Sequence, residues 1–172
     1  MDKNNIEKIA QFYKIVQEKR IYPVYQPIVS LKNGEIIGYE ALTRIDLEST
    51  GIEPEEFFHM AEEEGCLWTV EEMCRFKSLE ESKDKKPGKK LFLNVDPNVI
   101  KDPMFRKGIT RAFLKEFGLY PEDIVFEITE RNSIEDQESF QGIIQHYKAQ
   151  NFEIAIDDFG NGYAGLNRIC SL

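Results

Sequence analysis

The stretch "IYPVYQPIVSLKNGEIIGYEALTRI", residues 21–45, contains two β-rich runs joined through Asn33-Gly34. This dipeptide is among the strongest short hairpin signals, because both of its residues tolerate the positive φ angles of a tight turn. The sequence therefore predicts two antiparallel strands here. The second strand carries Glu40 in the middle of an apolar run, where an unpaired buried carboxylate would be costly.

Outside this hairpin, helix-length and strand-length segments alternate. The apolar spacing of residues 1–20 predicts a leading amphipathic helix. Thr69, with Glu72 three residues later, is predicted to cap the helix that it opens. The later elements are expected as helices at 54–65, 69–82, 102–118 and 133–150, and as strands at 90–97, 123–130 and 152–160.

Strands that alternate with helices after an initial hairpin indicate an α/β fold with a mainly parallel sheet. The near-regular repeat favours a TIM-like (β/α) barrel with an antiparallel first strand. Such a barrel has eight strands and typically ~250 residues. The 172-residue chain supplies about five of them, so we expect an incomplete barrel.

Composition narrows the possible partners. The chain has 31 acidic and 22 basic side chains and a net charge of −9, which argues against a nucleic acid polymer as its ligand. It contains no apolar run of the roughly 18 to 20 residues that cross a bilayer. Its three cysteines are scattered and fit a reducing compartment, so a cytoplasmic location with no membrane segment is expected.

Side chains that bear oxygen interrupt four successive apolar strands. They share one strand face by alternation, except for the last, which follows a strand end, and they are Glu40, Asn94, Glu127, Asp157 and Asp158. In a parallel barrel the carboxyl ends of the strands meet at one face, where active sites are built. We therefore expect these oxygens to converge on something positively charged.

The donor set indicates which cation. The two histidines, His59 and His146, lie in helical segments, and no cysteines cluster, so zinc is disfavoured. Glutamate, asparagine and aspartate oxygens suit Mg²⁺ or Mn²⁺. The adjacent Asp158 could hold a second ion about 3.5 to 4 Å from the first, the spacing of two-metal phosphoryl chemistry. Hydrolysis of a phosphodiester is the reaction that this set favours.

At this point the sequence resembles the EAL domain family, the bacterial cyclic di-GMP phosphodiesterases that open cyclic di-GMP to linear pGpG. "YEALTR" is similar to the signature that names the family. "YQPIV", "FLNVDP", "FEITER" and "IAIDDFGNGYAGL" follow in the family's order and spacing. The resemblance extends from about residue 20 to residue 172, so residues 21–172 are interpreted as the N-terminal two-thirds of such a domain.

The resemblance implies roles for individual residues. Glu40, Asn94, Glu127 and Asp157 would hold the first metal, Asp158 would help to hold a second, and Glu40 and both aspartates would count as catalytic. Gln26 and Arg44 would bind substrate, with Arg44 about 13 Å along the strand from Glu40. Glu130 would anchor the loop after the DDFG segment. For Arg44 and Glu130, an ion pair that touches no ligand is the alternative.

The chain also departs from the family pattern. Residues 161–165 read Asn-Gly-Tyr-Ala-Gly where active members usually show Thr-Gly-Tyr-Ser-Ser, and Asp96 stands where serine commonly precedes the proline. The family's catalytic lysine would lie beyond Leu172. We therefore expect an inactive fragment of an active phosphodiesterase that self-associates through its open sheet edges. The alternative is an EAL fold that serves as a cyclic di-GMP receptor or a scaffold for protein partners.

Overall fold

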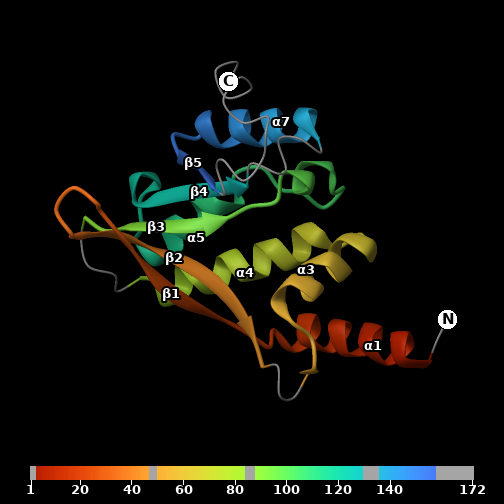
Figure 1. Ribbon diagram of the computed structural model, residues 1–172. Helices are drawn as coiled ribbons and strands as arrows, with labels where there is room; N and C mark the ends of the chain where they lie inside the picture. The colour runs from red at the N-terminus through yellow and green to blue at the C-terminus, as the bar shows by residue number, and fades with distance from the viewer. Residues whose placement is uncertain (1–2, 47–49, 84–87, 130–135, 158–172) are drawn as a thin grey trace, which may run out of the picture.

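The structure, a computed structural model, describes residues 3–46, 50–83, 88–129 and 136–157. Within these ranges a five-stranded sheet is flanked by helices (Figure 1). The elements in chain order are α1 Lys3–Glu18, β1 Ile21–Val29, β2 Ile36–Ile45, α3 Pro54–Glu63, α4 Leu67–Glu81, β3 Lys90–Asn94, η1 Pro97–Lys101, α5 Ile109–Phe117, η2 Pro121–Asp123, β4 Ile124–Thr129, α7 Gln137–Lys148 and β5 Glu153–Asp157.

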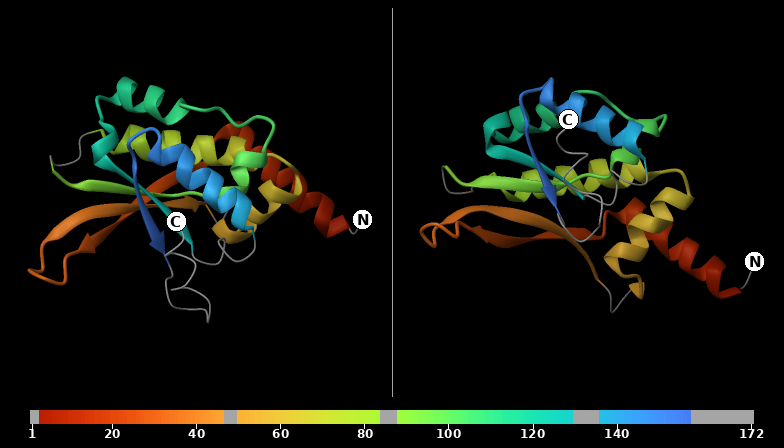
Figure 2. Two further views of the ribbon diagram at one scale, coloured as in Figure 1. Left: turned by 90° about the horizontal axis from the view of Figure 1, so that it is seen from above. Right: turned by 45° about the horizontal axis from the view of Figure 1, so that its top comes forward.

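The predicted hairpin is confirmed. Strands β1 and β2 are antiparallel, and each later neighbour is parallel, in the order β1-β2-β3-β4-β5. The turn closes through a Gly34 N–H that donates to the Ser30 carbonyl at 2.8 Å, with Gly34 at φ 73°. A positive φ is a conformation that glycine adopts at no steric cost. Figure 2 shows this hairpin extending away from the helices.

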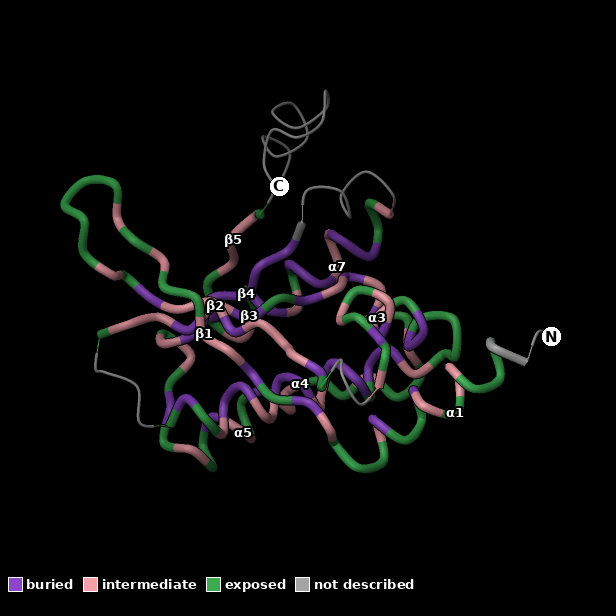
Figure 3. The backbone as a smooth tube through the Cα atoms, turned by 60° about the horizontal axis from the view of Figure 1, so that its bottom comes forward, coloured by how far each residue is buried: buried purple, intermediate pink, exposed green. Residues whose placement is uncertain are grey.

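The parallel α/β class is confirmed as well, with the five strands forming an open sheet between the edge strands β1 and β5. Buried residues alternate along β3, where Leu91 and Leu93 belong to the core shared with the helices, whereas residues 124–128 of β4 are all buried. Phe126 of β4 stacks on Tyr147 of α7 with ring centroids 3.8 Å apart. Figure 3 shows that stretches of buried residues occur both in the sheet and in the helices that pack on it.

Helix α1 contributes to the same core, because Phe12 and Ile15 are fully buried and Phe12 packs on Phe57 of α3. The leading helix thus forms where the periodicity of its sequence places it. The division of the chain into a helix of residues 1–20 and a domain of residues 21–172 stays a prediction. Among the described segments, no helix has the length and the apolar run that a bilayer crossing requires.

Three predicted helix starts are wrong. Helix α7 begins at Gln137 and not at residue 133, because the Asp136 side chain caps it by accepting the Ser139 N–H. Helix α4 begins at Leu67, and Thr69 lies inside its first turn, because the Asp102 carboxylate accepts the Trp68 N–H at 2.9 Å. An acceptor supplied from a distant loop thus replaces the cap expected within the helix. Helix α5 begins only at Ile109, because Gly108 at φ 83° interrupts a helical path from residue 102. Its predicted end at Gly118 is confirmed.

Candidate functional site

The candidate site begins at the pairing of β1 and β2. Gln26 is the register partner of Glu40, so the two side chains leave the sheet on the same face. Glu40 in turn pairs with Phe92 of β3, and Phe92 packs against β2 close to Gly38. A methyl group on Gly38 would lie 2.6 Å from the Lys90 carbonyl oxygen and 2.7 Å from the Phe92 ring. Glycine therefore lets β3 and its side chains approach the strand that carries Glu40.

Asn94 joins Glu40 directly, although it lies two residues beyond the register partner of Glu40. Its Nδ2 donates a hydrogen bond of 2.8 Å to Glu40 Oε1. Glu40 is half-buried and Asn94 is exposed, so neither side chain is enclosed in the core. Their predicted convergence on one face holds.

Glu127 is the buried member of the set, with 9% of its surface exposed. It pairs with Asn94 on β3 and with Ala155 on β5. Its Oε2 is buried and has no hydrogen-bond partner in the structure. Burial, together with the nearby charges of Glu40 and Asp157, raises the pKa of Glu127 to about 7. Three carboxylates from three strands therefore repel one another across this face.

Asp157 is the last residue of β5 and is exposed. It pairs with Thr129, which is two residues beyond Glu127 along β4 and therefore on the same face. The predicted second metal ligand, Asp158, and the predicted loop anchor, Glu130, lie outside the described residues. Residues 161–165, where the sequence departs from the family pattern, also lie outside them.

Arg44 stands apart from this set. It lies near the end of β2 opposite Tyr22, and its guanidinium donates a 3.0 Å hydrogen bond to the Thr43 carbonyl. Alternation places it on the strand face of Glu40, as predicted. Glu130, its partner in the alternative of an ion pair, lies outside the described residues.

The side-chain oxygens of this set are of the types that bind a hard divalent cation. Amide and carboxylate oxygens are the ligands that Mg²⁺ and Mn²⁺ prefer, and the unpartnered Glu127 Oε2 is a buried acceptor that a cation would satisfy. In the described part of the chain, no three histidine, cysteine or acidic side chains are grouped tightly enough to hold a metal. We call the sheet face that carries Glu40, Asn94, Glu127 and Asp157 the oxygen face; on it the Asn94 amide is hydrogen-bonded to the Glu40 carboxylate.

Sequence reasoning missed one residue that contacts this region. Glu71 lies in α4, and its Oε1 accepts the Asp96 N–H at 2.7 Å, two residues after Asn94. The i,i+4 pair of Glu71 and Arg75 was a signal in the sequence, but such pairs are ordinary on exposed helix surfaces. Only the burial of both side chains distinguishes this one.

Comparison with known proteins identifies the family of this chain. The sequence profile of the EAL domain matches residues 9–172. The chain is 29% identical over 161 residues to the probable cyclic di-GMP phosphodiesterase PdeB of Escherichia coli (strain K12), covering 91% of this chain and 31% of that protein. It spans roughly a fifth to a third of the length of three such curated relatives.

Solved structures agree with the fold. The FimX EAL domain from Pseudomonas aeruginosa bound to c-di-GMP superposes with a TM-score of 0.81 at 24% identity, covering 96% of this chain and 67% of that one. The manganese and cyclic di-GMP complex of Klebsiella pneumoniae BlrP1 gives a TM-score of 0.72 at 25% identity over 88% of this chain and 38% of that one. With its sequence profile, strand order and sheet all in agreement, the chain belongs to the EAL domain family.

Proposed function

We propose that the protein containing this chain hydrolyses cyclic di-GMP to linear pGpG with Mg²⁺ or Mn²⁺ as cofactor. The observation that carries the proposal is the oxygen face on which Glu40, Asn94 and Glu127 meet, with an unpartnered buried Glu127 Oε2. The name of PdeB as a probable cyclic di-GMP phosphodiesterase supports the substrate, and the BlrP1 manganese complex supports the metal.

Glu40, Asn94, Glu127 and Asp157 would hold the cation, and Asp158 would help to hold a second one. A bound divalent cation supplies a positive charge that polarises a phosphoryl oxygen and stabilises charge in the transition state. Asn94 would orient Glu40 through the hydrogen bond between their side chains. Burial is the main cause that raises the pKa of Glu127 toward neutrality, and repulsion by the Glu40 and Asp157 carboxylates in the absence of a cation adds to it.

Gln26 and Arg44 would bind the dinucleotide. Gln26 is exposed directly opposite Glu40, and its amide can donate to and accept from a polar group of the ligand. Arg44 has a planar guanidinium with several donors, which suits a phosphate. Glu130 would anchor the loop that follows β5. The assigned roles of these three residues remain part of the proposal.

The alternative is a receptor or scaffold that binds cyclic di-GMP or a protein without cutting a bond. The sequence of residues 161–165 favours it, because alanine and glycine replace hydroxyl side chains there. Chromatography of a reaction that contains full-length protein, cyclic di-GMP and Mn²⁺ separates the two functions. Appearance of pGpG supports the phosphodiesterase, whereas retained cyclic di-GMP binding without pGpG supports the receptor.

The chain of 172 residues is proposed to be inactive alone and to self-associate. Its edge strands differ, because β1 carries Pro23 and Pro27, which lack N–H donors, whereas β5 has none. Edge β5 is thus the better surface for pairing with a second copy. Light scattering at ~100 μM tests this, a concentration at which open edges associate. A monomer would contradict it.

A further inference from the structure

Helix α4 buries an ion pair beneath the sheet. Glu71 and Arg75 are 7% and 4% exposed, and Arg75 Nη2 lies 3.0 Å from Glu71 Oε2. A buried pair of charges is seldom a net source of stability, because removing both ions from water costs about as much as their attraction returns. Its presence in the core therefore calls for an explanation other than stability.

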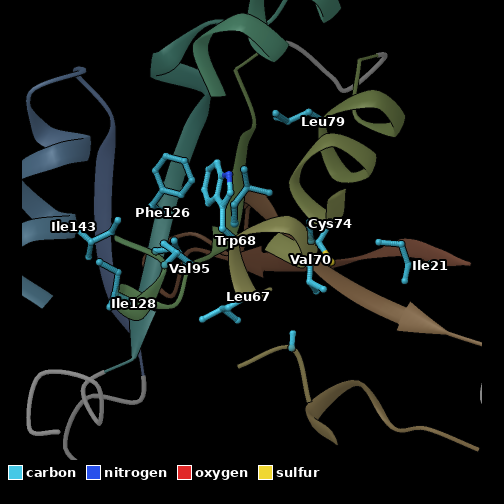
Figure 4. Packing of buried hydrophobic residues seen from close by; sticks show 14 of the residues in the cluster. Ile21, Leu67, Trp68, Val70, Cys74, Leu79, Val95, Phe126, Ile128 and Ile143 are labelled. Carbon is cyan, nitrogen blue, oxygen red and sulfur yellow. The ribbon is translucent and has the colours of Figure 1, made fainter. Parts of the chain in front are cut away.

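Arg75 is held from several directions. Its Nη1 donates to Thr110 Oγ1 of α5 at 3.1 Å. Its guanidinium carbon lies 5.4 Å from the Trp68 ring centroid, 5.1 Å from that of Phe126 and 5.6 Å from that of Tyr147. Figure 4 shows Trp68 and Phe126 side by side in this part of the core. A cation fixed in this way holds the carboxylate of Glu71 in one place.

The second oxygen of the Glu71 carboxylate contacts the backbone that follows β3, the strand that carries Asn94. Glu71 Oε1 accepts the Asp96 N–H at 2.7 Å, across 25 residues of sequence. The preceding N–H, of Val95, donates to the Glu127 carbonyl at 3.0 Å. The chain that leaves β3 is thus held on one side by a candidate ligand strand and on the other by α4. Burial raises the pKa of Glu71 to about 7, and both Arg75 and the Asp96 N–H act against this rise by favouring the ionised carboxylate.

These contacts with the backbone after β3 position Asn94, which lies two residues before Asp96. It must present Nδ2 to Glu40 Oε1, and small backbone shifts after β3 would break the 2.8 Å contact. We propose that Glu71 is a positioning residue, whose Oε1 fixes the Asp96 backbone and so holds Asn94 against Glu40. The inference rests on the proposed function for its consequence, because a displaced Asn94 and Glu40 would bind a divalent cation less tightly.

Two double variants isolate this hydrogen bond from the buried charges. Glu71→Gln with Arg75→Met and Glu71→Met with Arg75→Met have equal net charge and near-equal side-chain length. They differ in whether residue 71 retains an acceptor for the Asp96 N–H. The first readout is the NMR signal of the Asn94 side-chain amide in the metal-free chain. The second is Mn²⁺ affinity of the full-length protein, measured by calorimetry with the metal alone.

We expect the Gln-containing double variant to keep the wild-type Asn94 amide signal. The Met-containing double variant should move that signal toward the position of a solvent-exposed amide. Its dissociation constant for Mn²⁺ should rise on the order of 10- to 100-fold relative to the Gln-containing variant, as when a partner that orients a metal ligand is lost. Equal Asn94 signals and Mn²⁺ affinities within about threefold, far below that range, would overturn the inference.

A second pair of variants tests the same bond from its donor side and leaves Glu71 and Arg75 intact. Asp96 has φ −85°, which a proline can nearly adopt, and Asp96→Pro removes the N–H and places its Cδ against Glu71 Oε1, so it disrupts this contact more strongly than loss of the hydrogen bond alone. Asp96→Ala keeps the N–H and, like proline, loses the side chain that accepts the Asn98 N–H. Only Asp96→Pro should displace the Asn94 signal and weaken Mn²⁺ binding; the same behaviour from both would overturn the inference.

The two readouts separate this inference from the proposed function. A wild-type protein that binds no Mn²⁺ would contradict the metal-dependent phosphodiesterase. The Asn94 amide signal would still decide the role of Glu71, because it is recorded without metal. A wild-type protein that binds Mn²⁺ while all four variants bind it equally would contradict the positioning role alone.

Discussion

Glu71 in α4 and Glu127 in β4 are both buried glutamates, but their surroundings differ. Glu71 has Arg75 at one oxygen and the Asp96 N–H at the other. Glu127 has an Oε2 without a hydrogen-bond partner, and the charges near it, Glu40 and Asp157, have its own sign. Burial raises the pKa of each to about 7, but only Glu71 has partners that act against the rise. A buried carboxylate with complementary partners can hold the backbone in place, whereas one surrounded by like charges is suited to binding a cation.

The largest effect is expected at the cation-binding side of this comparison. Glu40→Ala or Asp157→Ala in the full-length protein should lower Mn²⁺-dependent hydrolysis of cyclic di-GMP by more than the roughly 100-fold that loss of a supporting partner costs. Each variant should leave the metal-free melting temperature unchanged or raised, because removing one carboxylate relieves repulsion. Activity assays and thermal unfolding check both halves. A marked drop in melting temperature would make these carboxylates structural partners.

The next largest effect concerns the free energy of unfolding, which should fall when Glu71 is replaced and should stay equal or rise when Glu127 is replaced. Glu71→Met leaves the Arg75 charge buried without its carboxylate, which should lower the free energy of unfolding by about 3 to 5 kcal/mol. Glu127→Gln removes a repelled charge and should be neutral or stabilising in the metal-free chain. Urea unfolding of the two variants measures the difference. Similar losses from both would remove the distinction drawn between these residues.

A smaller effect is expected where β3 approaches the strand of Glu40. Gly38→Ala places a methyl group 2.6 Å from the Lys90 carbonyl, and backbone cannot move aside as a flexible side chain can. The free energy of unfolding should fall by about 1 to 3 kcal/mol, as in overpacked cores. Gly142→Ala is the matched control, because its methyl group would meet only a terminal Ile100 carbon at 3.1 Å. Equal stabilities for the two variants would show that the strands separate freely.

The smallest effect is a pH dependence of the metal-free fold. Folding raises the pKa of Glu127 from 4.5 to about 7, so folding favours its protonated form. The corresponding stability is complete below pH 4.5 and is lost as the pH rises through about 7. Melting temperature should therefore fall over this window, and less steeply in Glu127→Gln. Saturating Mn²⁺ should oppose the fall in melting temperature. Identical pH profiles for the wild type and Glu127→Gln would contradict the contribution of Glu127 to this pH dependence.

Much of the site could be predicted from the sequence because a strand has a period of two. The positions of Glu40, Asn94, Glu127 and Asp157 within their strands placed all four on one face, and the register agrees. Their exposure could not be predicted in this way. It depends on what surrounds each side chain: Glu127 lies between β3 and β5 and is buried, whereas Asn94 and Asp157 end their strands and are exposed.

Sequence alone determined the order of strands and helices, the hairpin at Asn33-Gly34 and the residue types of the oxygen face, because these follow from local propensity and alternation. Tertiary structure decided what depends on distant partners. Asp102 sets the start of α4. The stagger of β2 against β3 brings Asn94 within hydrogen-bond distance of Glu40. Burial distinguishes Glu71 and Arg75 from an ordinary i,i+4 pair on a helix surface, and Glu71 also accepts the Asp96 N–H. No local pattern encodes these contacts, because each joins segments brought together only when the core packs.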